Sequence, residues 1–289
     1  MSDESEAKVR ALPCWRGAVE IVPVRGGDRA SAFKVKDERG FFHVRLFQEN
    51  ALTREREAAA QRAAHAAGLA PRVAYAGDGA LVSDFIEGRP LSARDVARRT
   101  ETVVMLLRRA HLYAGRRVLG DTAAFWVFQI LRDYAHRLQA AGHPLAKKCP
   151  RFLAIAEKLE EAQAPMRMAF GHHDVRPERF VDDGDRLWVT GWSRAGFGTA
   201  VFDLASLSLS SEFSAADDKR LLDAYFGGAP PPDVFRSFGA MKVASILRQA
   251  LGATVASLDA SPEGADHGAL AARSMKRFEA LYSAYQDRF

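Results

Sequence analysis

The sequence predicts an α+β protein with two lobes, a small β-rich N-terminal lobe with one helix and a larger, mainly helical C-terminal lobe. Two observations predict this class. Up to Gly88 the chain consists mostly of short strand-forming runs separated by turn residues. Beyond Pro90, apolar residues recur at spacings of three and four, which is typical of amphipathic helices. We expect the lobes to span residues 1–88 and 89–289.

The small lobe is expected to contain a meander of strands and one helix. Gly26 and Gly27 mark a glycine-rich turn after the first strand. Thr53 is the expected cap of an Ala-, Arg- and Glu-rich helix that stops at Gly68. The expected strands are residues 19–24, 31–36, 41–47, 72–76 and 81–85.

The larger lobe is expected to consist of amphipathic helices around one strand-and-loop element at residues 170–198. The expected helices are residues 93–113, 122–141, 152–163, 215–225, 233–258 and 267–289.

The composition argues against several classes of protein. The net charge is +5, but the basic residues are spread over helical stretches, so no nucleic-acid partner is expected. The two cysteines, Cys14 and Cys149, lie far apart, which favours a reducing compartment and argues against structural zinc. No run approaches the roughly 18 apolar residues of a membrane span, and the N-terminus lacks the apolar core of a secretory signal. We therefore expect a soluble, cytoplasmic protein without a membrane partner.

The segment 170–205 carries the most informative motifs. A loop with His172 and Asp174 precedes two short strands joined by an Asp-Asp-Gly turn, and Trp192 and Asp203 follow. The order and spacing resemble the catalytic and metal-binding loops of choline and ethanolamine kinases and aminoglycoside phosphotransferases. Their pattern is H-x-D-x-x-x-x-N, then I-D-W-E-x-A-G, then D-P-x-x-D-L-A.

The small lobe carries motifs that resemble the same family. Gly26 and Gly27 resemble the turn that covers the nucleotide phosphates, G-G-L-T-N-x-x-Y-x-V. Arg45 resembles the basic residue of V-L-R-I, which meets those phosphates. Glu57 resembles the acid of the R-E-x-E-A helix, which pairs with that base.

The segment Leu81–Gly88 resembles the family's hinge, L-V-T-E-F-I-E-G, where backbone groups near Phe85 and Ile86 receive the adenine. Taken together, the resemblance covers nearly the whole chain. It implies a two-lobed protein-kinase-like fold that binds ATP or a related nucleotide, or a small-molecule ligand, in the cleft between the lobes.

The resemblance also implies roles around the loop. Such kinases position the phosphates, neutralise their charge with magnesium and orient an alcohol with an aspartate. Asp174 stands at that aspartate's position, where it would act as the catalytic base or hold the hydroxyl in line. His172 and Asp203 are expected to brace the loop.

Two positions depart from the family's metal site. Arg179 stands five residues after Asp174, where the pattern has its metal-binding Asn, and Gly191 replaces the metal-binding Asp of I-D-W. A hard divalent cation needs oxygen ligands, whereas arginine offers none and carries a permanent positive charge. Magnesium is the family's metal, but we predict no metal-binding residue here.

Further departures point in the same direction, and one of them concerns the substrate. Ser193 replaces the acidic residue after the tryptophan, and Ala30 replaces the asparagine of the glycine turn. Leu247–Gly252 resembles the bacterial L-R-E-A-L-W with glycine in place of tryptophan. Because aromatic faces stabilise quaternary ammonium groups, choline is not the expected substrate.

Two hypotheses follow. The favoured one is a pseudokinase that binds a nucleotide, metabolite or protein without standard Mg-ATP phosphoryl transfer. The alternative is an active ATP-dependent phosphotransferase on a small hydroxyl substrate such as an amino alcohol, with Asp174 as base. Its displaced metal ligands would be Asp182, Asp183 or Asp185, which we instead expect to form a turn. A different reaction, with Arg179 on a phosphate, stays open.

Overall fold

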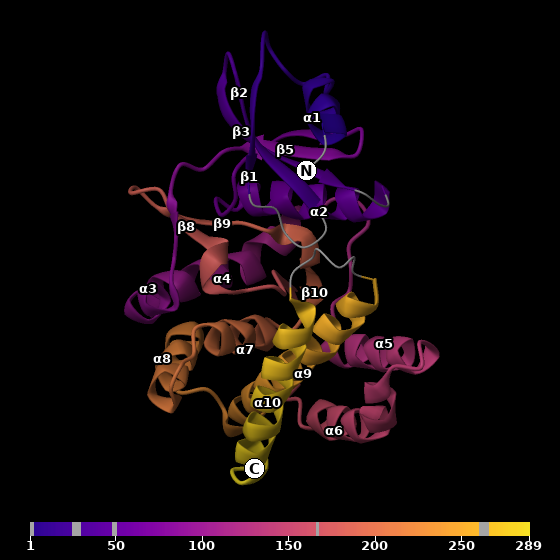
Figure 1. Ribbon diagram of the computed structural model, residues 1–289. Coiled ribbons are helices and arrows are strands. Elements are labelled where there is room, and N and C mark those ends of the chain that lie inside the picture. Colours follow the sequence, from indigo (N-terminus) through magenta and orange to yellow (C-terminus); the bar gives the residue numbers. More distant parts are fainter. Residues whose placement is uncertain (1–2, 25–29, 48–50, 166–167, 260–265) are drawn as a thin grey trace.

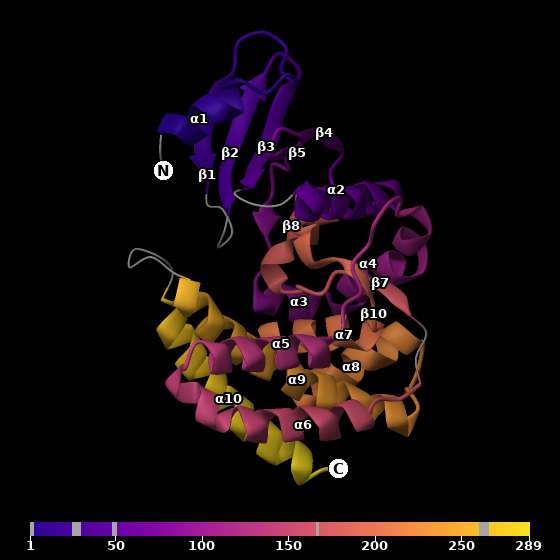
Figure 2. The same ribbon diagram turned by 90° about the vertical axis from the view of Figure 1, so that its right-hand side faces the viewer.

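A computed structural model describes residues 3–24, 30–47, 51–165, 168–259 and 266–289 of the chain. An N-terminal β-sheet region is stacked on a larger helical region, and the C-terminal helix ends on the side of the helical region that is remote from the sheet (Figures 1 and 2). This arrangement confirms the predicted α+β class and its order along the chain. The boundary between residues 88 and 89 stays a prediction.

The N-terminal sheet has five antiparallel strands in the order β1-β2-β3-β5-β4. Alternate residues of β2 and β3 point to one face, where Phe33 pairs with Val44 and Val35 with Phe42. All four are buried, as the two-residue period of a half-buried strand requires. The strands are β1 Glu20–Val24, β2 Ala30–Asp37, β3 Gly40–Phe47, β4 Val73–Gly77 and β5 Ala80–Asp84.

A short helix, α1 (Asp3–Arg10), covers one face of this sheet (Figure 2). The sequence analysis did not predict it, because α1 is almost wholly polar and buries chiefly Val9. Trp15 completes the contact, since its indole N–H donates to the Val9 carbonyl (2.7 Å) and its ring meets Phe42 edge-on. The predicted glycine turn at Gly26 and Gly27 lies outside the described residues.

Helix α2 (Ala51–Ala66) lies between the sheet and the helical region (Figure 1). It packs on β4 and β5 on one side and on the short helices η1 (Ala114–Arg117) and η4 (Trp192–Arg194) on the other. The helix begins two residues before Thr53, so the predicted cap was wrong. Its position lets residues of α2 reach both regions.

Eight α-helices make up most of the described helical region. Its core includes the fully buried rings of Phe128, Phe152 and Phe202. The helices are α3 Ala93–Arg98, α4 Thr100–Tyr113, α5 Val127–Ala140, α6 Cys149–Glu161, α7 Ala200–Ser210, α8 Ala215–Phe226, α9 Pro232–Asp259 and α10 His267–Gln286. None of the described helices is long and apolar enough to cross a membrane.

The structure changes two of the predicted helices and adds a third that was not predicted. The stretch 93–113 is two helices, because Arg99 leaves the helical conformation (φ −117°, ψ 29°). Helix α5 starts at Val127 rather than residue 122, because the Phe125 N–H donates to the Phe197 carbonyl (2.7 Å) and holds the chain extended. Helix α7 was missed, since residues 201–208 are all buried, polar ones included, and its sequence therefore has no clear polar face.

The predicted strand-and-loop element consists of short strands between the two regions. Strands β7 (Ala169–Gly171) and β10 (Gly196–Gly198) pair with each other, and β8 (Phe180–Asp182) joins β6 (Arg89–Pro90) and β9 (Leu187–Val189). The loop between β7 and β8 therefore has both ends fixed in sheets. It presents the residues of the candidate site.

Candidate functional site

Asp203, in the first turn of α7, holds the loop between β7 and β8. Its two carboxylate oxygens accept the backbone N–H groups of His172 and His173, each at 2.7 Å, and His111 approaches at 3.0 Å. Burial opposes ionisation of this carboxyl, but the nearby His173 and His111 hold the pKa of Asp203 well below its usual range. The prediction that Asp203 braces the loop is confirmed.

His172 fixes the loop from inside. Its Nε2 bonds the Thr190 carbonyl (2.9 Å), and its Nδ1 accepts the Asp174 backbone N–H (3.2 Å). Those contacts require a proton on Nε2 and none on Nδ1, which is the neutral ring. Burial lowers the pKa of His172 in the same direction. The predicted bracing role of His172 is confirmed.

His173 adopts a left-handed backbone conformation (φ 58°) and is fully buried. Its ring stacks on Phe125 with centroids 4.1 Å apart, and its Nε2 bonds the Gly196 carbonyl (3.1 Å). Burial lowers the pKa of His173 to about 4, so the ring is neutral at pH 7. Both histidines therefore hold the loop in place.

Asp174 lies in a loop held in this way, and arginines surround its carboxylate. Arg179 donates to Asp174 Oδ2 from Nε (3.1 Å) and from Nη2. Arg176 Nη2 lies 3.5 Å from the same oxygen. Partial burial would raise the pKa of Asp174, but these cations outweigh it and lower the pKa below its ordinary value. The carboxylate is ionised and already paired.

Arg179 also fills the space beside Gly191. Arg179 directly precedes β8 and Gly191 follows β9, and the pairing of these strands continues in the Thr190 N–H, which donates to the Arg179 carbonyl (2.8 Å). A Cβ atom added at Gly191 would lie 2.6 Å from Arg179 Cζ and 2.9 Å from Arg179 Nε. Gly191 has φ of 79°, a conformation that most side chains avoid. The guanidinium therefore occupies the place of a side chain at residue 191.

The donors around Asp174 do not fit a magnesium ion. Asp174 supplies a carboxylate, but Arg179 and Gly191 supply no side-chain oxygen. Within the described residues, no three His, Cys, Asp or Glu side chains come together as metal ligands would. The residue set matches a bound guanidinium better than a divalent cation.

The alternative ligands Asp182, Asp183 and Asp185 belong to the β8–β9 turn. Asp183 Oδ1 accepts the backbone N–H groups of Asp185 (3.0 Å) and Arg186 (2.8 Å). Asp182 Oδ1 accepts the Gly184 N–H (3.1 Å) and its Oδ2 pairs with Arg99. The prediction that this segment forms a turn is confirmed.

Arg45 on β3 and Glu57 on α2 form an ion pair between Arg45 Nη1 and Glu57 Oε1. Glu57 is 4% exposed, and its second oxygen has no hydrogen-bond partner in the described part of the chain. Burial raises the pKa of Glu57, while Arg45 and then Arg179 lower it. The charge of Arg179 acts on Glu57, so the Arg45–Glu57 pair lies within electrostatic range of the Asp174 loop.

Phe85 and Ile86 of the predicted hinge line a hollow of about 390 Å³. The hollow lies between the end of α2, β5 and the β8–β9 turn, and the Arg45–Glu57 pair and Asp174 do not line it. The Phe85 N–H already donates to the Phe41 carbonyl (3.0 Å). The structure therefore groups the predicted site residues into two sets, one around Asp174 and one at the hinge.

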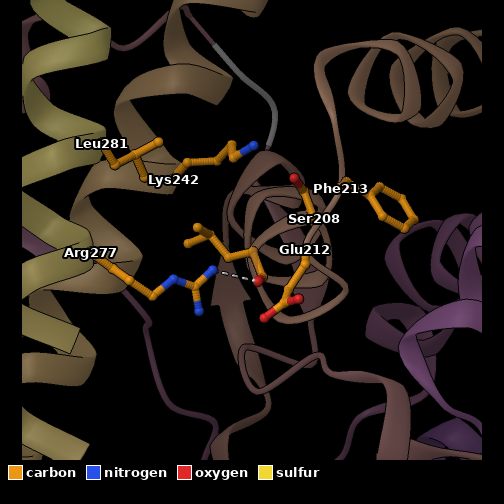
Figure 3. Close-up of a pocket in the computed structure, with 7 residues that line it drawn as sticks. Ser208, Glu212, Phe213, Lys242, Arg277 and Leu281 are labelled. Carbon is orange, nitrogen blue, oxygen red and sulfur yellow. Dashed lines mark hydrogen bonds between the residues drawn. The ribbon is translucent and has the colours of Figure 1, made fainter. Parts of the chain in front are cut away.

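A second hollow, of about 370 Å³, lies between α7, α9 and α10 (Figure 3). Its lining residues include Lys242 and Arg277 but none of the predicted site residues. Both cations are engaged, since Lys242 pairs with Asp218 (2.6 Å) and Arg277 donates to the Leu209 carbonyl (3.1 Å). The residues that line this hollow do not include any residue of the Asp174 loop.

The sequence analysis missed Arg176 and Arg248 as site residues. Arg176 is next but one to Asp174 and contacts it, as described above. Arg248 lies on α9 and interacts electrostatically with Asp174 and Arg176. The signal in the sequence was the excess of arginine in the loop, but the approach of α9 is a tertiary feature.

The fold and the site define a protein-kinase-like phosphotransferase scaffold. Its family follows from comparison with known sequences: residues 20–237 match the model of the phosphotransferase enzyme family, and the chain belongs to that family. No curated protein sequence matches the chain. The predicted family is thereby confirmed.

Solved structures of kinases have a fold similar to that of this chain. A choline/ethanolamine kinase family protein from Mesorhizobium loti is 26% identical with a TM-score of 0.75, over 96% of this chain and 94% of that one. An ethanolamine kinase from Plasmodium vivax is 14% identical with a TM-score of 0.76, over 94% and 84%. LicA in complex with AMP is 17% identical with a TM-score of 0.75, over 97% and 100%. The last two support the fold alone.

Proposed function

We propose that the chain binds a nucleotide in the cleft between its sheet and helical regions and does not perform standard Mg-ATP phosphoryl transfer. One observation carries the proposal: the Arg179 guanidinium binds Asp174 and fills the space above Gly191. A family metal site would need oxygen ligands at both positions 179 and 191. Here one position holds a cation and the other has no side chain.

The electrostatics oppose a second cation. A charge of +2 placed about 4 Å from the guanidinium is repelled by roughly 8 kcal/mol at the effective dielectric of a protein surface. Asp174 cannot offset this alone, because its charge already interacts with Arg179 and Arg176. Mg²⁺ also prefers near-octahedral oxygen coordination, which these residues do not provide.

The chain retains residues that would bind the phosphates of a nucleotide without a metal ion. Arg45 keeps its position beside Glu57 and would meet a phosphate, and Arg179 would contribute a second positive charge without metal. Gly26 and Gly27 would cover the phosphates, and Phe85 and Ile86 would mark the adenine side. The AMP bound to the related LicA fold supports a nucleotide as ligand.

The alternative function is an active phosphotransferase on a small hydroxyl substrate with Asp174 as base. The rigid loop around Asp174 favours it, because His172 and Asp203 hold that residue in place. However, a general base is most effective when its pKa lies near the working pH. The arginines move the pKa of Asp174 in the opposite direction.

Thermal shift with ATP, in EDTA and in magnesium, tests the proposal. We expect ATP to raise the melting temperature equally in both, and Arg45→Met to reduce the shift. A phosphoryl-transfer assay with choline, ethanolamine and aminoglycosides should show little turnover. A magnesium-dependent shift, or robust turnover that Asp174→Asn abolishes, would establish the alternative. Absence of any ATP shift would leave a metabolite or a protein as the partner.

A further inference from the structure

Arg248, in the middle of α9, is a partly buried cation that faces the loop. Its guanidinium lies 5.7 Å from the Phe202 ring centroid. Its Nε atom is buried and has no hydrogen-bond partner among the described residues. An unmade bond at a buried charged donor costs about 1–3 kcal/mol, so this nitrogen is suited to receive an acceptor from a ligand.

Two further arginines lie within electrostatic range of Arg248. Arg194, on the turn after Gly191, and Arg176, beside Asp174, both interact electrostatically with Arg248. Their repulsion and the burial of Arg248 lower the pKa of Arg248 to about 10, with burial as the larger cause. Arg176 and Arg194 are exposed and therefore reachable from solvent.

Asp174 is a carboxylate that interacts with Arg248, but Arg179 already binds it and Arg176 lies 3.5 Å from it. Position 193, where the family pattern has an acid, is Ser193. Neither position therefore gives Arg248 a carboxylate of its own.

Tyr134 on α5 lies close to α9 one turn beyond Arg248. A Cβ atom added at Gly252, one turn beyond Arg248, would lie 3.0 Å from the Tyr134 ring. The phenol thus packs directly over the glycine and interacts electrostatically with Arg248. A half-buried hydroxyl at this position offers a hydrogen bond to an oxyanion.

We infer that the side of the cleft between the Asp174 loop and helices α5 and α9 binds a small molecule through its phosphate group, with Arg248, Arg194 and Arg176 as the ligands. Guanidinium groups bind phosphate oxygens with paired, charge-assisted hydrogen bonds. A cationic amino alcohol would instead meet three positive charges. The inference deepens the proposed binding function, because it names the chemical class that the second half of the same cleft accepts.

A matched pair of small molecules tests this inference by isothermal titration calorimetry at constant ionic strength, in EDTA. We expect sn-glycerol 3-phosphate to bind, and glycerol and ethanolamine not to bind. Arg248→Gln should weaken binding at least tenfold, since a charge-assisted bond contributes about 1.5–3 kcal/mol. Arg194→Gln, at an exposed position, should weaken binding without affecting the fold.

Arg236→Gln serves as the matched control, because Arg236 is an exposed arginine on the same helix and away from the loop. It should leave the affinity unchanged. Ethanolamine binding as tightly as glycerol 3-phosphate, or equal affinity in wild type and the folded Arg194→Gln and Arg248→Gln variants, would overturn the inference. So would the absence of any glycerol 3-phosphate binding.

The two proposals fail separately. Arg45→Met should reduce the thermal shift by ATP and leave glycerol 3-phosphate binding intact. Arg248→Gln should do the reverse. A protein that binds glycerol 3-phosphate but not ATP refutes only the nucleotide proposal, and the opposite result refutes only the phosphate site on α9.

Discussion

The Arg179 guanidinium lies where a side chain of residue 191 would lie, so we predict that mutations at these two residues are energetically coupled. Arg179→Asn removes the bonds to Asp174, which we expect to cost about 2 kcal/mol of the free energy of unfolding. Gly191→Asn places a Cβ 2.6 Å from Arg179 Cζ, so the guanidinium must leave and the same bonds break.

The positive φ of Gly191 adds a second cost to the Gly191→Asn variant. A side chain in the left-handed region costs roughly 1 kcal/mol, and asparagine tolerates it better than most residues. The single variant should therefore lose about 3 kcal/mol. In the double variant the loss of the Arg179–Asp174 bonds is counted once, so the total should be about 3 kcal/mol rather than about 5.

Urea unfolding followed by tryptophan fluorescence measures this coupling, in EDTA so that no metal contributes. Mutations that act independently add within about 0.5 kcal/mol. Additivity within that range would refute the conclusion that Arg179 occupies the side-chain space of residue 191. A coupling of 1–2 kcal/mol in the stabilising direction supports it.

A companion pair of variants tests the metal site itself. Arg179→Asn with Gly191→Asp restores the two oxygen ligands of the family pattern, whereas Arg179→Asn with Gly191→Asn provides the same shape without the second carboxylate. We expect only the Asp-containing variant to gain a magnesium-dependent thermal shift with ATP. A gain in both variants would show that shape rather than ligand chemistry excludes the metal.

Three further predictions concern the supports of the site, each read from urea unfolding. Asp203→Asn should lower the free energy of unfolding by about 3 kcal/mol at pH 7, because the native carboxylate is buried and hydrogen-bonded. Since the pKa of Asp203 is depressed in the folded protein, the difference in stability between wild type and variant should shrink as the pH falls through that pKa. The single variant Arg45→Met should lose more free energy of unfolding than the double variant Arg45→Met with Glu57→Met, because the single change leaves the Glu57 carboxylate buried and unpaired. The wild type should lose up to about 3 kcal/mol between pH 6.5 and 4 through His173, whose pKa is about 4 when folded and ordinary when unfolded, and His173→Asn should lessen this loss.

Each of these has a clear contrary result. An Asp203→Asn variant as stable as the wild type at pH 7 would mean that the loop does not need this brace. Equal costs for the single and double Arg45 variants would mean that Glu57 finds other partners. An unchanged acid slope in His173→Asn would mean that other groups produce the loss of stability below pH 6.5.

The elements with strong local patterns were predictable from the sequence. Strands β2 and β3 alternate buried and exposed residues, and α8 begins at a Ser214 capping box and ends at Gly227. Motif order and spacing sufficed for the family and for the position of Asp174. Elements without such a local pattern were missed or misplaced: α1 is too polar, α7 has no clear polar face, and the start of α5 depends on a bond to Phe197.

The sequence by itself determined which residues replace the family's metal ligands, because spacing along the chain counts positions without reference to space. Only the tertiary structure decided what the replacements do. Arg179 lies against Gly191 because β8 and β9, which join the two positions along the chain, pair side by side. Arg248 approaches the Asp174 loop because α9 packs against α5 and α7. Contacts between residues distant along the chain arise from packing, which local patterns do not encode, and here packing brings Arg248 of α9 towards the loop that carries Asp174.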